Sequence, residues 1–440
     1  AAKVDGNGAV KEKKEKKEGK EGKEGKEGKE GKEKKDKKEK KDKKHRRDAA
    51  ADEGAGGLGD GFPQTIAGFF AFMQEREAIR VRRQNMVPRP WTEDPVLRCT
   101  RFANVKREHD RTGAAMGRAL HARASEWQRL GEHDDEREAT ARDLVLTAAL
   151  GRRFGAAEFI AELGVVRAPQ SPAAVEALVG RALDVACALW RDGLHACTDA
   201  YEPASTCHTL EMAAWLRINE ASGGDRRPEE LTQCIRLLYE AEREGAAPRE
   251  LRRLRRALAS AGGERYVRAA YEGFLTGQDC PIDELVTGSG DVARAICQRG
   301  AGAPTWRAPA EALGRVAGYR DPGGAHAAEV MRDLVSSPLL DRCADFDSWA
   351  AVSAPARRCL GRLFSRSCPE DTPPEQLLLD LRKVFSSQRK FWPPLIEGAP
   401  PATLTLPDVQ AQLGEFERYL EARRGRPERG AFFPRGPIAA

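Results

Sequence analysis

Residues 90–111 read PWTEDPVLRCTRFANVKREHDR, and this stretch decides the fold. Asp94 can accept hydrogen bonds from the first free N–H groups of a helix, and Pro95 suits the first turn, where its missing N–H does no harm. Such a cap contributes about 1 kcal/mol to the stability of a helix. The stretch therefore predicts a helix that begins after Asp94 and runs on to Arg111.

Polar side chains recur along this predicted helix at steps of three and four residues, which places them on two neighbouring faces. The first face carries Arg101, Asn104, Glu108 and Arg111, and the second carries Arg98, Phe102, Val105 and His109. Arginines, an asparagine and carboxylates in register can hold phosphate, hydrogen-bond a base or tie neighbouring helices together. The pattern leaves open whether these charges bind a ligand or form internal ion pairs.

The body of the chain is rich in alanine, leucine, arginine and glutamate, and it has few runs of β-branched residues. This composition predicts an all-α, multi-helix fold, for which a helix-hairpin-helix, glycosylase-like arrangement is one candidate. Short breaks with glycine or proline separate the expected helices. These helices are expected at residues 68–84, 138–150, 173–190, 228–244 and 248–261.

Two glycine-rich sites lie between predicted helices. Gly262 and Gly263 predict a tight turn between two helices, which could present backbone N–H groups to a DNA phosphate. Residues 288–290, Gly-Ser-Gly, predict a second loop before a helix at 291–298. That loop could cradle a phosphate or simply cap a helix.

The first 48 residues differ from the rest in charge. They hold 21 basic and 13 acidic groups, a net charge of +8, whereas the remaining chain has a net charge of −2. The overall net charge of +6 therefore describes neither part. Glycines recur in a Lys-Glu-Gly repeat, and each costs a helix about 1 kcal/mol relative to alanine. We expect residues 1–60 to form a disordered tail and joint, and residues 61–430 to form one helical domain.

Residues 34–47 concentrate the lysines and end in Arg46 and Arg47. Such a cluster is typical of nuclear targeting and of loose contacts with nucleic-acid phosphates. A solvated linker is the alternative, because interspersed glutamates dilute the positive field. Any DNA affinity of the tail alone should be weak and lost at moderate salt.

Several classes of protein are excluded by what the sequence lacks. The uncharged run at residues 61–73 is far shorter than the roughly 20 apolar residues of a membrane span. No P-loop signature occurs, so the chain encodes no nucleotide-binding loop of that type. His195 and His208 lie near Cys197 and Cys207, but their spacing matches no compact zinc knuckle, and we expect no metal site.

The cysteines and the N-terminus indicate the setting of the protein. None of the ten cysteines forms a C-x-x-C pair, so we expect reduced, mostly buried thiols in an intracellular protein. The sequence begins without methionine and without an apolar signal core, which indicates an incomplete or processed chain and not a secreted precursor.

Several blocks of the sequence resemble a known family. PWTEDPVL at 90–97, RFANV at 101–105 and REHDR at 107–111 together resemble the opening of the 5-hmdU DNA kinase helical domain. That family looks related to the alpha-glutamyl/putrescinyl thymine pyrophosphorylases of DNA base hypermodification. Thinner similarity follows in order at residues 144–154, 257–274, 287–290 and 408–419, the last of which reads DVQAQLGEFERY.

The resemblance implies an all-α, DNA-associated domain that recognises or helps to modify thymine-derived bases such as 5-hydroxymethyluracil. Any chemistry would be transfer of a phosphoryl-type group to that base in DNA. The implied nucleic-acid contacts are Arg98, Arg101, Asn104, Arg107 and Arg111. The implied acid and base candidates are Glu108, Asp110, Glu272 and Glu415.

Two departures from the family pattern count against intact chemistry. Gln410 and Ala411 stand where the late signature has Glu-His, and residues 273–275 stand where an acidic-aliphatic pair is usual. A carboxylate and an imidazole can transfer protons, whereas an amide and a methyl group cannot. If the family works through those groups, this chain is expected to be a binding remnant.

The leading hypothesis is a nuclear protein that binds DNA containing 5-hydroxymethyluracil, with the kinase module lost or carried by a separate partner. The nucleotide donor and any cofactor are left open, and no membrane partner is expected. A second hypothesis is a non-catalytic nuclear adaptor whose arginine and glutamate faces contact proteins. A third is a base-modifying enzyme with a glycosylase-like cleft, which has to extrude its target base from the stack.

Overall fold

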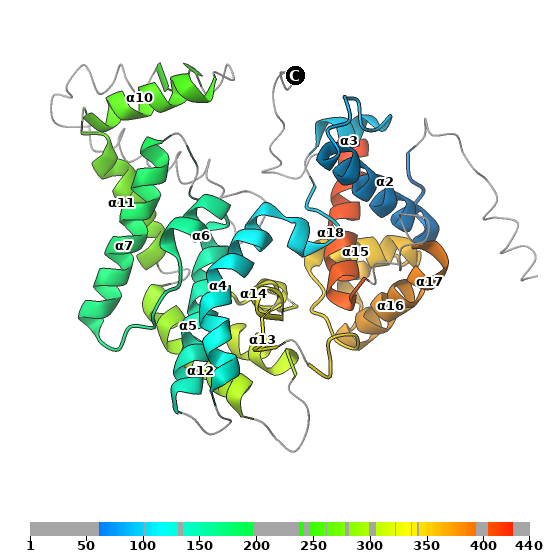
Figure 1. Cartoon of the computed structure of the whole chain (residues 1–440). Coiled ribbons are helices and arrows are strands. Elements are labelled where there is room, and N and C mark those ends of the chain that lie inside the picture. The colour runs from blue at the N-terminus through cyan, green and yellow to red at the C-terminus, as the bar shows by residue number, and fades with distance from the viewer. Residues whose placement is uncertain are drawn as a thin grey trace, which may run out of the picture. The chain divides into compact units, whose positions relative to one another are not determined.

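The computed structural model describes the chain from Gly61 to Gly425 with gaps (Figure 1). Outside the described residues lie the expected tail at 1–60, Arg101, most of the helix predicted at 228–244, and His195, His208, Cys197 and Cys207. The described residues are 61–100, 102–130, 135–192, 194, 196, 237–238, 240–241, 247–260, 262–277, 281–298, 305–321, 323–335, 337–340, 343–392 and 404–425. They are mainly helical, which confirms the prediction of an all-α fold.

The helices at the two ends of the described chain begin at caps that the sequence encodes. Thr65 precedes α2 (Ile66–Gln84), and its hydroxyl oxygen accepts a hydrogen bond from the N–H of Gly68 at 3.0 Å. Thr405 precedes α18 (Leu406–Arg423) and forms a capping box with the third helical residue, Asp408. Caps of this kind satisfy N–H groups that have no partner inside the helix.

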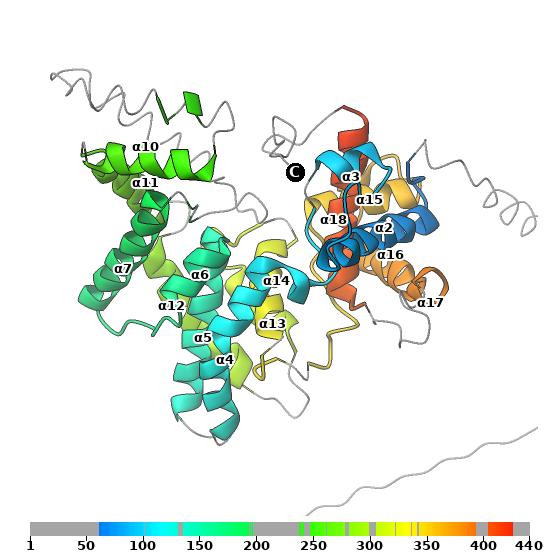
Figure 2. The ribbon, with the colours of Figure 1, turned by 45° about the horizontal axis from the view of Figure 1, so that its top comes forward.

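One group of helices brings the start and the end of the described chain together (Figures 1 and 2). In this group, α18 packs against α2, α3, α15 and α16. We refer to it as the α18 group. It consists of α2, α18, α3 (Pro95–Cys99), α15 (Ala354–Leu363), α16 (Pro374–Ser386), α17 (Gln388–Phe391) and the short 3-10 helix η3 (Pro369–Asp371).

The core of the α18 group is aromatic. Phe72 of α2 lies between Phe416 and Tyr419 of α18, with ring centroids 5.1 and 5.0 Å away. Phe69 contacts Phe416 at 5.8 Å, and all four rings are fully buried. Each such side chain removes a large apolar area from water, so this contact contributes strongly to joining the two ends of the described chain. The burial confirms the buried start predicted for the helix at 68–84.

The remaining helices pack around α5 (Asp135–Phe154). In Figure 1, α12 and α4 lie beside α5, while α10, α11 and α7 lie together at the other end of the group. We refer to this as the α5 group. Besides α5, it contains η2 (Arg107–His109), α4 (Arg111–Arg129), α6 (Ala157–Leu163), α7 (Pro172–Arg191), α10 (Pro248–Ser260), α11 (Glu264–Thr276), α12 (Ile282–Cys297), α13 (Arg307–Leu313) and α14 (Ala325–Val335).

Three further predicted helices, at 138–150, 173–190 and 248–261, are confirmed as α5, α7 and α10. The predicted glycine turn also forms, because Gly262 follows α10 with a φ of 84° and α11 begins at Glu264. A side chain with a Cβ rarely adopts that left-handed conformation, which explains the choice of glycine.

The prediction of a second glycine loop at 288–290 is wrong. These residues lie inside α12, and Ser289 donates its hydroxyl to the carbonyl of Val286 at 2.7 Å. A Cβ on Gly288 would come within 2.2 Å of the Val316 side chain. The glycine therefore permits close packing within a helix, and tertiary contacts override its low helix propensity.

The prediction of one helix from Asp94 to Arg111 is also wrong. The cap forms as expected, but α3 ends at Cys99, and Thr100 has an extended backbone with φ −109° and ψ 134°. A loop and η2 then lead to α4, which begins at Arg111. The two predicted helical faces therefore do not exist.

Among the described residues, no helix is both long and apolar enough to cross a membrane.

Candidate nucleic-acid interface

Asp94 joins the start of α3 to α18. One carboxylate oxygen accepts the N–H groups of Val96 and Leu97, each at 2.9 Å. The other accepts the hydroxyl of Tyr419 at 2.6 Å, and that hydroxyl in turn accepts the N–H of Phe62 at 3.3 Å. Burial, followed by the bond to Asp94, raises the pKa of Tyr419, so the hydroxyl stays protonated and donates. A local cap, from Asp94 to Leu97, is thus fixed by a residue more than 300 positions later.

Side chains of α18 also hold the loop that replaces the predicted helix. Gln412 donates to the carbonyls of Asn104 and Val105 at 3.0 and 3.2 Å. Glu415 accepts the N–H of Ala103 at 3.3 Å. These bonds satisfy backbone groups that a helix would have paired internally, which is why the chain can leave the helix after Cys99.

Asp110 and Asn104 close this loop on the other side. The carboxylate of Asp110 accepts the backbone N–H of Asn104 at 2.8 Å, and the Asn104 amide donates to the carbonyl of His109 at 2.7 Å. These local bonds are the usual way in which aspartate and asparagine compete with a helix. Both residues therefore shape the loop, and the amide N–H that could read a base is engaged within it.

A buried arginine that the sequence reasoning missed lies behind the loop. Arg76 of α2 donates to Gln412, and its guanidinium lies 4.8 Å from the ring centroid of Phe72 and 5.4 Å from that of Phe102. Burial lowers the pKa of Arg76 to about 10, although the nearby carboxylates of Glu415 and Asp110 oppose the shift. The signal was present in the sequence, because Phe69, Phe72, Met73 and Arg76 share one helical face.

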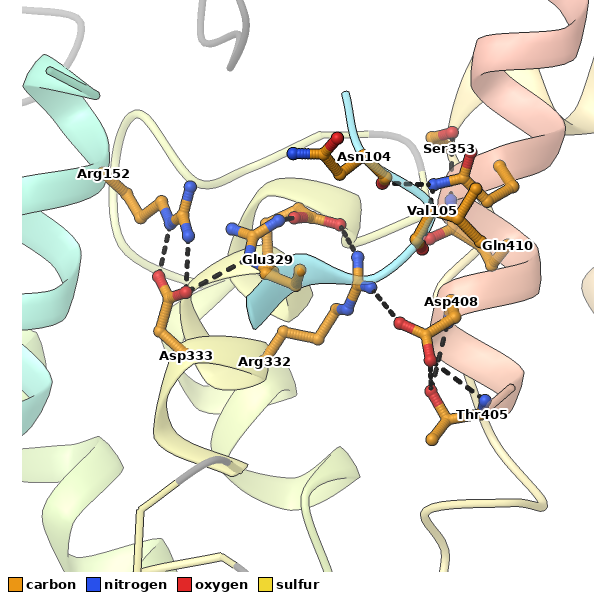
Figure 3. A network of polar contacts seen from close by, with 12 residues as sticks. Asn104, Val105, Arg152, Glu329, Arg332, Asp333, Ser353, Thr405, Asp408 and Gln410 are labelled. Carbon is orange, nitrogen blue, oxygen red and sulfur yellow. Dashed lines mark hydrogen bonds and ion pairs between the residues drawn. The ribbon is translucent and has the colours of Figure 1, made fainter. Parts of the chain in front are cut away.

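Arg107 belongs to a network of alternating charges (Figure 3). It donates to Glu329 and Asp333, both on α14. Asp333 also pairs with Arg152 of α5, and Glu329 with Arg332. Arg332 then reaches Asp408 in the first turn of α18 at 2.6 Å. We refer to these six residues, Arg107, Arg152, Glu329, Arg332, Asp333 and Asp408, as the charge network.

The charge network is largely removed from water. Asp333 is 3% exposed and Arg152 is 4% exposed. Burial would raise the pKa of Glu329, but Arg107, Arg332 and Arg152 outweigh it and lower its pKa to about 2. The carboxylate is therefore charged at neutral pH. Since α5, η2, α14 and α18 each contribute to the network, it links the α5 group to the α18 group.

The predicted nucleic-acid contacts divide by exposure. The side chains of Arg98 and Arg111 are 42% and 79% exposed and pair with Glu93 and Glu158. The Arg107 side chain is only 11% exposed and is engaged in the charge network. Arg101 lies outside the described residues. Of the described set, Arg98 and Arg111 are therefore the ones that present charge at the surface, and their role in binding stays a prediction.

The predicted acid and base candidates do not form one site. Asp110 and Glu415 both bind backbone N–H groups of the loop at Ala103 and Asn104. Glu108 is exposed and pairs with Lys106 at 3.7 Å. Glu272 lies exposed on α11, which packs against α7, α10 and α12. Their catalytic role stays a prediction.

Gln410, which stands where the late family signature has glutamate, also has a structural role. Gln410 is 6% exposed, and its amide donates to the hydroxyl of Ser353 at 3.1 Å. Ser353 is the N-cap of α15, so this bond ties α18 to α15.

No group of three or more histidines, cysteines, aspartates or glutamates within the described ranges could hold a metal ion.

The surface next to the motif at residues 90–111 carries several arginines. Residues 78–92 contain four arginines and no acidic residue. Arg82 donates to the carbonyl of Trp91, while the guanidinium of Arg89 lies 4.6 Å from the Trp91 ring centroid. We refer to residues 82–91 as the arginine turn. It ends in the Pro-Trp pair that opens the motif, and Arg98 donates to the carbonyl of Thr92 at 2.7 Å just behind it.

These features define an all-α domain in which a loop-forming motif is held by a distant helix and bordered by exposed arginines. Residues 64–130 match the family model of the helical domain of 5-hmdU DNA kinase. The match covers α2, α3, η2 and α4, and it confirms the resemblance carried by residues 90–111. Comparison with curated proteins gave no match, and comparison with solved structures gave none.

Proposed function

We propose that this helical domain binds DNA that carries thymine-derived modified bases, with 5-hydroxymethyluracil as the leading candidate. The supporting observation is that the segment matching the 5-hmdU DNA kinase helical domain carries exposed arginines, in the arginine turn and at Arg98, beside its motif. Exposed guanidinium groups suit phosphates, which supply most of the affinity of proteins for DNA. Arg98 pairs with Glu93 and Arg82 with Glu75, so these two would exchange a carboxylate for a phosphate on binding. The basic cluster at residues 34–47 would direct the protein to the nucleus.

Phosphoryl transfer would require a separate partner in this proposal. The chain contains no P-loop signature, and Gln410, at a position where the family signature has a carboxylate, serves as a buried tie to Ser353. The domain would therefore supply recognition of the base, while a kinase partner would supply the nucleotide and the transfer chemistry.

A binding experiment tests the proposal. The full chain and a variant that lacks residues 1–48 would be titrated onto duplexes containing thymine or 5-hydroxymethyluracil across a salt series, followed by fluorescence anisotropy. We expect preference for 5-hydroxymethyluracil in both proteins and a shallower salt dependence in the shortened one, because the tail adds only phosphate contacts. Equal binding of both duplexes that disappears with the tail would contradict the proposal.

Two additions sharpen the experiment. Arg98→Ala should weaken binding, whereas Arg294→Ala, which removes an equally exposed arginine paired with Asp291 on α12, should leave it unchanged. Incubation with ATP followed by mass spectrometry of the bases then distinguishes recognition from catalysis. Selective binding without a change in mass supports the proposal, and a phosphorylated base would make this chain an enzyme by itself.

A further inference from the structure

The arginine turn has an apolar tip that the proposed DNA binding does not by itself explain. Met86 is 86% exposed and Val87 is 43% exposed, and Pro88 follows them at the surface. Among the large hydrophobic side chains that the structure describes as exposed, Met86 is the most exposed. Scattered exposed hydrophobic residues are common, but these neighbours form the end of one projecting turn.

The backbone of this tip is fixed. The N–H of Met86 donates to the carbonyl of Arg83 at 3.1 Å, and the N–H of Val87 donates to that of Arg82 at 2.9 Å. The indole N–H of Trp91 donates to the carbonyl of Val87 at 2.6 Å, which closes the turn from its other side. The turn therefore presents its tip with little cost of ordering the backbone at the moment of binding.

The conformation of Met86 is unusual for its residue type. Its φ is 56°, in the left-handed region that glycine and asparagine adopt readily and other residues rarely adopt. The chain thus keeps a methionine where glycine would fit with less strain, although this side chain is mostly exposed in the free protein. Strained residues that the surrounding structure holds in place cluster at sites of ligand contact.

The charges around the tip identify its partner. Arg83 precedes the tip and Arg89 follows it, and both side chains are exposed. Arg82 is partly exposed, but it pairs with Glu75 at 3.1 Å and donates to the carbonyl of Trp91, so it supports the turn. An apolar side chain flanked by arginines is complementary to a DNA duplex, in which stacked bases lie between two phosphate chains. Proteins that enter the minor groove insert methionine, leucine, phenylalanine or proline between base steps while arginines contact the backbone.

We propose that the arginine turn is a DNA wedge, in which Met86 enters a base step from the minor groove while Arg83 and Arg89 hold the flanking phosphates. This inference rests on the proposed DNA binding and adds a mechanism to it. Insertion unstacks the step and bends the duplex, which lowers the cost of exposing a neighbouring modified base to a modifying enzyme.

Fluorescence of 2-aminopurine tests the wedge, because this base brightens when it is unstacked. The full chain would be titrated onto a duplex with 5-hydroxymethyluracil next to 2-aminopurine, with anisotropy recorded in parallel. Met86→Gly removes the side chain and suits the backbone conformation, so this variant should fold. Met86→Leu keeps an apolar wedge, and Leu379→Ala truncates an exposed leucine on α16 as a matched control.

We expect the wild type, Met86→Leu and Leu379→Ala to brighten the probe, and Met86→Gly to bind within about threefold of the wild-type affinity without brightening it, since phosphate contacts dominate affinity. Binding without brightening by the wild type, or brightening by Met86→Gly, overturns the wedge and leaves the proposed function standing. Absence of binding by the wild type at low salt overturns both. If Met86→Gly and Arg89→Ala match the wild type in both signals, the turn does not contact the DNA and the wedge is wrong.

Discussion

Arginine has opposite roles in two regions of this molecule. In the charge network, Arg107 and Arg152 are largely buried and contact the carboxylates of Glu329 and Asp333, and this links η2, α5 and α14. In the arginine turn, Arg83 and Arg89 border an apolar tip at the surface, and only Arg82 pairs with a carboxylate, that of Glu75. The contrast teaches that the arginines of a recognition motif have to be sorted by their surroundings before any of them is assigned to a ligand.

The strongest test of the contrast removes a buried member of the charge network. Asp333→Ala should lower the free energy of unfolding by about 3–5 kcal/mol, because it removes the buried carboxylate that pairs with Arg152 and one of the two carboxylates that pair with Arg107. Asp291→Ala is the control, since it removes an exposed carboxylate that pairs with Arg294 and should cost less than about 1 kcal/mol. Urea unfolding of both variants measures the difference. Equal effects would show that the network does not carry the fold.

Acid should weaken the charge network through Glu329. Its pKa is about 2 in the folded chain and ordinarily near 4.5, so protons bind the unfolded state first as the pH falls. The stabilisation is complete above about pH 5 and is lost progressively toward pH 2, amounting at most to about 3 kcal/mol. Unfolding curves of the wild type and Glu329→Gln across this range should therefore converge at low pH. Parallel curves would mean that Glu329 is not coupled to the arginines.

Removing one hydroxyl tests the tie between the motif and α18. Tyr419→Phe should destabilise the chain by about 1–3 kcal/mol, because Asp94 loses a buried donor and the N–H of Phe62 loses an acceptor. Tyr319→Phe is the matched control, since that hydroxyl donates to the neutral carbonyl of Ala149. It should cost less, about 0.5–1.5 kcal/mol. A larger effect of the control in thermal unfolding would contradict the role given to Asp94.

The arginine turn should contribute least to stability. Arg89→Ala loses only an exposed stacking contact with Trp91, so the free energy of unfolding should change by less than about 1 kcal/mol. Calorimetry or urea unfolding checks this value. A loss as large as that of Asp333→Ala would make the turn a structural element and remove the basis of the comparison.

The sequence predicted the helices better than it predicted the structure of the motif at residues 90–111. The Asp94 cap, the buried phenylalanines of α2 and the turn at Gly262 follow from local rules, and each is confirmed. The break after Cys99 does not follow from local rules, because its backbone groups are satisfied by Gln412 and Glu415, about 300 residues away. Local periodicity carries no information about such partners.

The same limit applies to the candidate site. Nothing near Arg107 in the sequence distinguishes it from Arg98, yet one lies in the charge network and the other at the surface. The small residues at 288–290 suggested a loop, although packing against Val316 keeps them helical. The resemblance at residues 90–111 located the right segment, and only the three-dimensional contacts separate its structural residues from its exposed ones.

The salt dependence of DNA affinity tests the central claim most directly. We would compare Arg89→Ala and Arg107→Ala with the wild type, at a temperature where circular dichroism shows all three folded. Each lost phosphate contact reduces the slope of log affinity against log salt by about one. We predict a reduction for Arg89→Ala and an unchanged slope for Arg107→Ala. The reverse result would place the DNA contact at the charge network and contradict the account.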